Sequence, residues 1–393
     1  VRRRICAAGG GSIITSSLVA SVVRLAMSER VFFPEALNSQ KSGMFPVRNG
    51  LLNVSAGKLL PHRAGHLTTV QTPHRFEPGA ECPEWLGWLE ERQEDQETRD
   101  QIQEIFGYCL ATHINYHRLF FFFGEGGTGK STCVDVLEWL VGEDNRVAVE
   151  LTELDNAFMR SQLVGKSLAL CKELTRNSLK HIGLIKAIVS SDPVAVDVKY
   201  GQGYDFRPSC RLVMESNVLP MSPDSSAGFE RRFIQVNFDK QIDRDKMEFN
   251  FQEKFKSEMS GILNWALVGY KRLKERGRFI HTERSKQATD DFKKHRAQVE
   301  TFLKSGILKQ YPHKENGEIT QLCVWMEDVF LAYHEWCAQE DVVAFYKEKS
   351  PFARELFTKK PEWRVRKKRE RVNDEIRDSR LYGIQIVENL VGV

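Results

Sequence analysis

The sequence of 393 residues lacks several features that would place it in a specialised class of protein. No run of about 18 apolar residues is present, the length that a transmembrane helix requires, so we expect no membrane span. The net charge is only +4, so any surface that binds nucleic acid must be local. The hydrophobic fraction of 41% is that of an ordinary globular protein, and the length predicts two or three domains.

The cysteines include no C-x-x-C pair and no Cys/His cluster at metal-ligand spacing. This arrangement argues against a structural zinc site. It is typical of reduced thiols in a cytoplasmic protein, which would mean the host-cell cytoplasm if the source is a virus. The eight cysteines are widely scattered, at positions 6, 82, 109, 133, 171, 210, 323 and 337.

What the sequence does contain is a phosphate-loop pattern, G-x-x-x-x-G-K-[ST], at residues 124–131. It directly follows the apolar run 119–123, and a helical apolar pattern follows it, so a buried strand would end in a glycine-rich turn that opens a helix. The glycines allow positive φ and close approach of the backbone, Lys130 can reach the β- and γ-phosphates, and the Ser131 hydroxyl can ligate Mg²⁺. The predicted nucleotide-binding residues are Gly124, Glu125, Gly126, Gly127, Thr128, Gly129, Lys130, Ser131 and Thr132.

From residue 119 onward, strand-like apolar runs alternate with helical ones, which predicts an α/β domain with a parallel sheet. The predicted strands are 119–123, 167–171, 211–216 and 233–238. Ligands of open α/β sheets bind beyond the carboxyl ends of the strands, so we expect polar residues at these ends to converge on the nucleotide.

Four later residues, each next to a predicted strand, carry side chains suited to phosphate chemistry. Glu173 follows a predicted strand and could activate a water molecule and support the metal. Asn217 follows the next strand and could contact the γ-phosphate. Arg231 and Arg232 precede the strand after that, and such an arginine often reaches a phosphate from a neighbouring subunit.

The flanking segments differ in composition from this α/β segment. Residues 1–104 are predicted to form an accessory region with a hairpin around Asn49-Gly50 and a helical stretch from Pro83 to Leu110. Residues 279–393 are predicted to form a small helical domain, and the α/β segment between them spans 105–278. Between Lys347 and Arg371 there are eleven Lys or Arg against four Glu, a local charge of +7. Such a basic stretch could contact duplex backbone, or it could be a solvated helix face.

Segment 194–203 alternates apolar and polar residues and ends in a glycine-rich tip that carries Lys199 and Tyr200. A cation can follow phosphates and an aromatic ring can stack on bases, both without sequence preference. Taken by itself, the pattern favours an ordinary edge hairpin over a DNA-binding one.

The ordered set GEGGTGKST, LALCKE, LIKAIVSSDPVAVDVKY, LVMESNVLP and PDSSAGFERRFIQVNF resembles the superfamily 3 helicase module of phage, plasmid and poxvirus primase-helicases. The resemblance covers roughly residues 45–275. It implies an AAA+-type ATPase core that binds ATP and Mg²⁺, forms a ring, commonly a hexamer, and translocates 3′ to 5′ on single-stranded DNA. A fused or separate primase or polymerase domain is a further partner that the resemblance allows, and a chain that begins with Val1 rather than Met could be a fragment of a longer protein.

The resemblance assigns roles to residues by position. Lys130, Ser131 and Thr132 match the phosphate loop, Glu173 the catalytic carboxylate, and Asn217 the polar sensor. Arg232 matches the arginine finger, which Arg231 would assist, while Lys199 and Tyr200 match the hairpin that points into the central channel. Position 172 is Lys, where many relatives of the broader superfamily carry a second acid, so metal support would fall to Ser131, Glu173 and water. The C-terminal part resembles a winged-helix-like tail.

Two other functions use the same phosphate loop. One is an ATP-switched replication initiator or primase-loading factor that binds DNA without robust unwinding. The other is a small-molecule kinase, which would have no use for the hairpin and the late arginine pair. The sequence therefore favours a replicative DNA helicase and leaves the initiator as its alternative.

Overall fold

The structure is a computed structural model, and it describes the greater part of the chain. The described residues are 43–62, 68–172, 174, 179, 181–198, 203–217, 227–241, 251–310, 323–340, 344, 346, 349–359, 370–372, 375–377, 380–382 and 384–386. They divide into two compact units. The first holds residues up to 220 together with 231–285, and the second holds 221–230 together with 286–393.

A parallel sheet of five strands forms the centre of the first unit, in the order β10-β4-β9-β6-β5. Four of its strands fall where the sequence predicts them, which confirms the mixed α/β class with a parallel sheet. The edge strand β5 was not predicted, because its three residues give no apolar run. The strands are β4 (Leu119–Gly124), β5 (Arg146–Ala148), β6 (Leu168–Lys172), β9 (Arg211–Ser216) and β10 (Phe233–Phe238).

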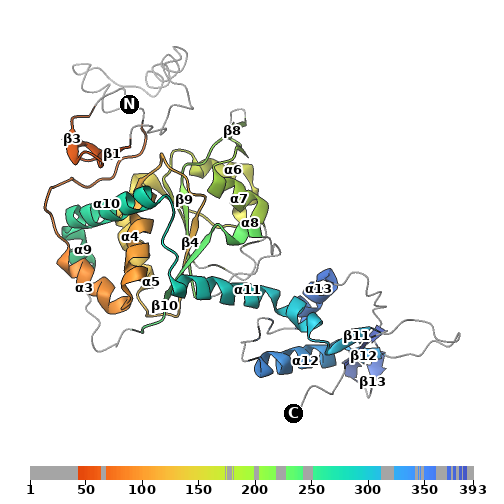
Figure 1. Cartoon of the computed structure of the whole chain (residues 1–393). Coiled ribbons are helices and arrows are strands. Elements are labelled where there is room, and N and C mark those ends of the chain that lie inside the picture. The colour runs from red at the N-terminus through yellow and green to blue at the C-terminus, as the bar shows by residue number, and fades with distance from the viewer. Residues whose placement is uncertain are drawn as a thin grey trace. The chain divides into compact units, whose positions relative to one another are not determined.

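Helices cover both faces of this sheet. Successive side chains of β4 point to opposite faces, and both sets are apolar, so each face needs a layer of helices to bury it. Phe120 and Phe122 belong to the core that includes α5 (Lys130–Val141), whereas Phe121 packs against the Phe233 ring at a centroid distance of 5.6 Å. Helices α4, α5 and α10 lie on one side of the sheet, and α6 and α7 on the other (Figure 1). The strand β4 is therefore buried on both faces, as its continuous apolar run requires.

The accessory segment begins with the predicted hairpin, extended to three antiparallel strands: β1 (Met44–Val47), β2 (Gly50–Asn53) and β3 (Lys58–Leu60). The single helical stretch predicted from Pro83 to Leu110 is instead two helices, α3 (Pro83–Arg92) and α4 (Gln96–Leu110). The break occurs because Asp95 adopts an extended conformation and its carboxylate caps α4 by accepting from the N–H groups of Glu97 and Thr98.

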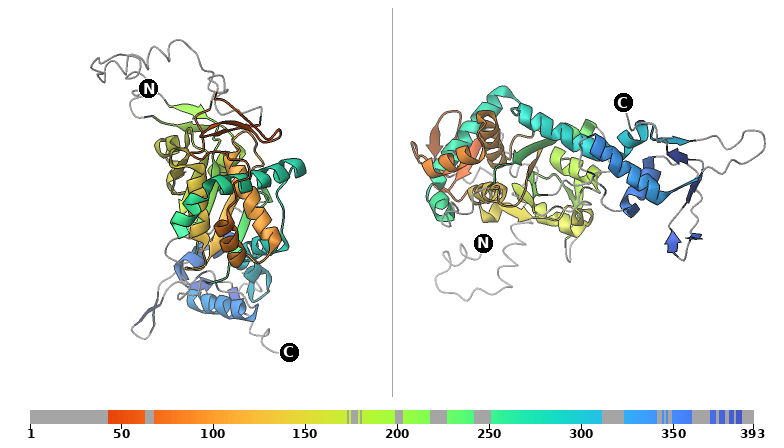
Figure 2. Two further views of the ribbon diagram at one scale, coloured as in Figure 1. Left: turned by 90° about the vertical axis from the view of Figure 1, so that its left-hand side faces the viewer. Right: turned by 90° about the horizontal axis from the view of Figure 1, so that it is seen from below.

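Helix α4 lies against α10 (Met259–Arg276) at backbone contact (Figures 1 and 2). Glycine makes this closeness possible, since a Cβ on Gly107 would lie 2.3 Å from the Ala266 carbonyl oxygen, and one on Gly269 would lie 2.3 Å from that of Gln103. Helix α4 also runs without interruption through residue 104. The described accessory and α/β segments pack as one compact unit. The predicted domain boundaries at residues 104 and 278 are not tested by this packing and stay predictions.

Two further interactions join the accessory helices to the end of the α/β segment. The fully buried Glu104 carboxylate pairs with Arg272 at 2.9 Å and with Arg276 at 2.6 Å, both on α10. The Trp85 ring stacks on Trp88 and meets Phe255 edge-on, at centroid distances of 5.3 and 5.6 Å. These contacts hold residues far apart in the sequence in one core.

The second unit has its own apolar core around Phe302, Tyr333, Trp336 and Phe352. Its helices in the described residues are the short α8 (Ala227–Glu230) and three longer ones, α11 (Glu283–Lys304), which begins in the first unit, α12 (Met326–Gln339) and α13 (Lys349–Lys359). Its strands pair antiparallel as β11 (Leu308–Gln310) with β16 (Ile384–Ile386), β12 (Cys323–Trp325) with β15 (Arg380–Tyr382), and β13 (Glu370–Val372) with β14 (Glu375–Arg377). Residues 347, 348 and 360–369 of the predicted basic stretch lie outside the described residues.

The remaining elements are short or lie at the borders of the sheet. They are η2 (Glu143–Asn145), η3 (Glu153–Asp155), α6 (Ala157–Arg160), η4 (Ser161–Leu163), α7 (Ile182–Ser190), β7 (Val194–Val196), β8 (Tyr204–Phe206), α8 (Ala227–Glu230) and α9 (Phe251–Ser257). Within the described ranges, none of the helices combines the length and the apolar character needed to cross a membrane.

Candidate functional site

The glycine-rich segment connects β4 directly to α5, as the phosphate-loop pattern predicts. Helix α5 begins at Lys130, and its N-cap residue Gly129 supplies no side-chain cap to the first N–H groups. The apolar pattern that the sequence shows after the loop lies on α5, and its residues Val134, Val136, Leu137 and Leu140 are fully buried. The loop is thus anchored by a buried strand on one side and a buried helix on the other.

The glycines of the loop serve different purposes. Gly127 and Gly129 have positive φ angles of 80° and 94°, whereas Gly124 and Gly126 do not, which corrects the expectation for those two. Gly124 is needed for space, because a Cβ there would lie 2.2 Å from the Phe238 carbonyl oxygen. A Cβ on Gly126 would meet nothing within 4 Å. The turn is therefore fixed at its base and open at its tip.

Two polar side chains of the loop, Lys130 and Thr128, are buried and bind the loop's own backbone. The buried Lys130 ammonium donates to the Glu125 carbonyl oxygen at 3.3 Å, and the Thr128 hydroxyl donates to the same oxygen at 2.9 Å. Ser131 is exposed, and Thr132 beside it is half-buried. The Glu125 carboxylate accepts a hydrogen bond from Gln241 at 3.0 Å.

Sequence reasoning missed one carboxylate, Glu215, which lies next to this loop. Glu215 is on β9, the strand beside β4, and its Oε1 accepts a hydrogen bond from the Ser131 hydroxyl. The side chain is 7% exposed, and its Oε2 is buried without a hydrogen-bond partner among the described residues. A charged residue directly after the apolar run Leu212–Met214 of a predicted buried strand was the signal that could have identified it.

Lys172, which stands where the resemblance implied an acid, is held by two carboxylates of α5. Its ammonium pairs with Asp135 at 2.7 Å and with Glu138 at 3.4 Å, and Glu138 also pairs with Arg146 at 2.7 Å. Burial alone would lower the pKa of Lys172, but the hydrogen bond to Asp135 and the charges of Asp135, Glu138 and Glu215 raise it. Lys172 therefore stays a cation and cannot ligate a metal.

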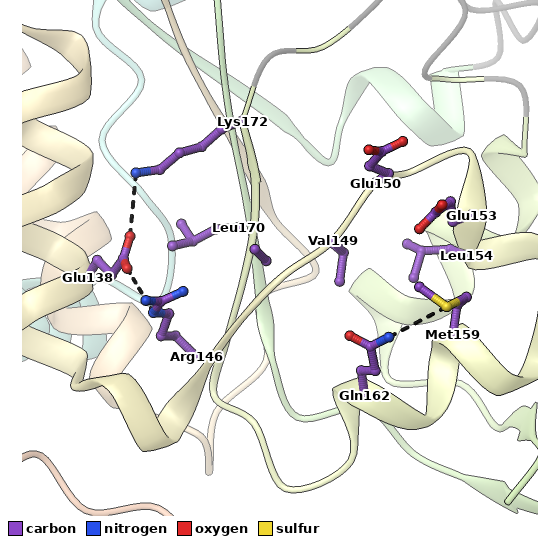
Figure 3. Close-up of a pocket in the computed structure, with 11 residues that line it drawn as sticks. Glu138, Arg146, Val149, Glu150, Glu153, Leu154, Met159, Gln162, Leu170 and Lys172 are labelled. Atoms are coloured by element: carbon purple, nitrogen blue, oxygen red, sulfur yellow. Dashed lines mark hydrogen bonds and ion pairs between the residues drawn. The ribbon is translucent and has the colours of Figure 1, made fainter. Parts of the chain in front are cut away.

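A cavity of about 430 Å³ opens beside this ion-pair network, next to β5 and β6 (Figure 3). No residue of the phosphate loop lines it, so it is separate from the predicted nucleotide site. Its lining residues are Glu138, Arg146, Ala148, Val149, Glu150, Glu153, Leu154, Met159, Gln162, Leu170 and Lys172.

The other predicted residues at this edge are only partly described. Asn217 is exposed and directly follows β9, one residue beyond the Ser216 that pairs with Phe123 of β4. Glu173 lies outside the described residues, as do Lys199 and Tyr200. The strands that flank those two, β7 and β8, form an antiparallel pair, as the predicted hairpin requires.

The two arginines lie at the opposite, amino-terminal edge of the sheet. The Arg232 carbonyl oxygen accepts from the N–H of Leu119, the first residue of β4, and its guanidinium donates to the Ser190 hydroxyl at 2.9 Å. Burial and the charge of Arg231 lower the pKa of Arg232, against the opposing charge of Asp192. The structure therefore does not bring Arg231 or Arg232 to the phosphate loop of their own chain.

Arg118, a residue that the sequence did not single out, belongs to the same arginine group. Burial, followed by the charges of Arg231 and Arg232, lowers its pKa against the opposing effect of Tyr108. Its Nε is buried without a hydrogen-bond partner in the part of the chain that the structure describes. The amino-terminal edge thus gathers three cations, an arrangement suited to receiving an anion.

The residues present fit a Mg²⁺-nucleotide. Uncapped N–H groups at the start of α5, together with Lys130, suit phosphates, and the open tip at Gly126 leaves room for them. The Ser131 hydroxyl and a neighbouring carboxylate are oxygen ligands of the kind Mg²⁺ prefers. No group of three or more His, Cys, Asp or Glu side chains in the described ranges could hold a metal by itself.

Comparison with known proteins gives two family matches. A family model described as "D5 N terminal like" matches residues 11–94, and a model described as a family of unknown function (DUF5906) matches residues 122–232. The second match runs from β4 to Arg232 and so spans the phosphate loop and the arginine pair.

Solved structures similar to this chain include two apo structures titled as the NrS-1 C terminal region. They have TM-scores of 0.43 and 0.44, are 14% identical to this chain, and each match covers 79% of this chain and 78% of that one. Because these TM-scores and identities are low, the assignment of the fold rests on the strand order and pairing of this chain alone. Through the D5 N-terminal-like region that precedes its phosphate loop, together with the motifs that follow it, the chain is related to the phage primase-helicases.

Proposed function

We propose that this chain is the ATPase subunit of a ring-forming replicative DNA helicase that translocates 3′ to 5′ on single-stranded DNA. The observation that carries the proposal is the separation of two phosphate-binding groups on one sheet. The phosphate loop lies at the carboxyl edge, and the arginines lie at the amino edge.

In the nucleotide half of the site, we assign each residue the role that its place in the sequence motifs implies. The N–H groups of the loop and the Lys130 ammonium bind the phosphates, and Ser131 holds Mg²⁺. Glu173 activates the attacking water, and Asn217 contacts the γ-phosphate. When bound, Mg²⁺ supplies positive charge that offsets the charge of the β- and γ-phosphates. The finer fold that we propose is accordingly an AAA+-type phosphate-loop core.

The other half of the site comes from the next subunit. Strand β4 has six residues, and at roughly 3.3 Å per residue it separates Arg232 from its own loop by about 20 Å. That span exceeds the length of an arginine side chain. In a ring built from head-to-tail interfaces, one edge of each copy meets the opposite edge of its neighbour. Arg232 would therefore complete the site of the adjacent copy, with Arg231 beside it.

DNA contacts come from two regions in this proposal. The β7–β8 hairpin presents Lys199 and Tyr200 to a strand in the ring channel, where the cation follows phosphates and the ring stacks on bases. The second unit, whose described residues include α11, α12, α13 and short antiparallel strand pairs, is a winged-helix-like domain in this proposal, and its basic stretch contacts DNA backbone.

The test is the ATPase rate of the wild-type chain with and without single-stranded DNA, on a sample of known oligomeric mass, followed by strand displacement. DNA-stimulated hydrolysis and unwinding of a duplex with a 3′ tail, but not of one with a 5′ tail, would support the helicase. Stimulated hydrolysis without unwinding would favour the ATP-switched initiator. A rate of ATP hydrolysis that does not change when DNA is added would refute both the helicase and the initiator.

A hairpin variant tests the DNA contact separately. Lys199→Ala should weaken single-strand binding and uncouple unwinding from hydrolysis. Because the variant neutralises one phosphate fewer, the slope of log K against log salt concentration should also become shallower by about 0.7. Lys186→Ala, on α7, is a control at a lysine outside the hairpin, and equal unwinding by both variants would remove the hairpin from the mechanism.

A further inference from the structure

The Glu215 carboxylate is the strongest feature that the proposed function leaves unused. Glu215 is 7% exposed and lies in the fully buried strand β9, and burial of a charged group is costly unless it is paired. Its Oε1 accepts from the Ser131 hydroxyl, and its Oε2 is buried with no partner in the described residues. The strand gains no stability from such a residue that an apolar side chain would not supply better.

The position of Glu215 relates it to the departure at Lys172. In the register of β6 and β9, Lys172 pairs with Glu215, so the two side chains lie on the same face of the sheet. That face is covered by α5, which contributes Ser131 as well as the two carboxylates that hold Lys172. This chain thus carries Lys172 on β6, where many relatives of the broader superfamily carry an acid, and carries the acid Glu215 at the neighbouring position of β9.

We propose that Glu215 is the positioning residue for the divalent metal at the phosphate loop. Its Oε1 accepts the Ser131 hydroxyl proton in a hydrogen bond and leaves the lone pairs of that oxygen for Mg²⁺. Its Oε2 accepts a hydrogen bond from a water on the metal. Partners of this kind orient metal ligands, and their loss typically lowers metal affinity 10- to 100-fold. The inference rests on the proposed nucleotide site and adds a residue to it.

The experiment titrates Mg²⁺ into a fixed concentration of fluorescent ATP with the full chain. It records the Mg²⁺ concentration at half-effect, alongside ATP affinity in EDTA. Glu215→Gln should raise the half-effect concentration about 10- to 100-fold and leave the affinity in EDTA within about twofold of wild type. Glu138→Gln is the matched control, because Glu138 also contacts Lys172 but not Ser131, and its midpoint should stay within about twofold of wild type.

Two further variants guard against a purely structural effect. Glu215→Asp keeps the charge on a shorter side chain and should give an intermediate midpoint, and it replaces Glu215→Gln in the test if the latter fails to fold. Ser131→Ala should raise the midpoint as Glu215→Gln does, and the double variant should be no worse than the more severe single one, because the two act through one hydrogen bond.

The outcomes separate the two proposals. A folded Glu215→Gln with a wild-type midpoint, or fully additive effects with Ser131→Ala, would overturn the role of Glu215 and leave the nucleotide site standing. Wild-type protein that does not bind ATP, or a Lys130→Ala variant that binds it equally well, would overturn the site and the inference with it.

Discussion

The separation of Arg232 from its own phosphate loop leads to a prediction about mixed rings. Arg232→Ala should bind ATP normally, because about 20 Å of strand lies between the two, but should hydrolyse it about 10³- to 10⁵-fold more slowly. Lys130→Ala should also hydrolyse ATP slowly, because it keeps Arg232 but loses the cation of the phosphate loop. Neither variant alone has a complete site.

Mixing the two inactive variants should restore activity. In a random one-to-one ring, about one interface in four joins an intact loop to an intact arginine, whatever the ring size. The mixture should therefore recover about a quarter of the wild-type rate, a gain of more than about 100-fold over either variant. Steady-state ATPase at fixed total protein measures this, with native mass spectrometry to show that mixed rings form.

The control replaces one partner with the double variant Lys130→Ala/Arg232→Ala. Mixed with Arg232→Ala, it contributes no intact arginine, so no recovery is expected. Absence of recovery in the first mixture, although mixed rings are present, would show that Arg232 does not act between subunits.

Three predictions concern other parts of the first unit. Glu104→Gln should lower the free energy of unfolding by about 3–5 kcal/mol in urea titrations, because it leaves two arginines of α10 without their buried anion; a loss below about 1 kcal/mol would contradict this. Burial lowers the pKa of His113 to about 4 from 6.5, so the unfolded chain binds the proton more readily. His113 should therefore cost stability as pH falls from 6.5 towards 4, by at most about 1.4 kcal/mol per unit, and His113→Gln should show a shallower pH dependence. Gly129→Ala should lower stability by about 1–3 kcal/mol because of its φ of 94°, whereas Gly126→Ala should be nearly neutral; equal thermal midpoints would refute this use of the loop geometry.

The sequence predicted the strands well because their apolar runs are long and buried on both faces. The bounds of β4 and β10 agree with expectation to within one residue. It did not predict β5, whose three residues carry too little pattern, or the break at Asp95, where local capping interrupts a continuous helical periodicity.

For the candidate site, the sequence identified the loop because its spacing is itself the signal. It could not identify Glu215, whose importance depends on a hydrogen bond to a residue 84 positions away. It also could not identify Arg118, which is brought near Arg231 and Arg232 by the pairing of β4 with β10. Nor could residue order alone show that the arginines and the loop lie at opposite edges. That fact depends on all strands being parallel.

The close packing of α3 and α4 on the rest of the first unit limits how such genes can be reshuffled. A recombination joint near residue 105 would separate Trp85 from Phe255 and Glu104 from its arginines. It would also remove Trp88, whose ring would lie 2.9 Å from a Cβ on Gly129 of the phosphate loop. Viable exchange between related genomes should therefore keep residues 83–276 together, so α3, α4 and the nucleotide-binding loop are expected to be inherited as one piece.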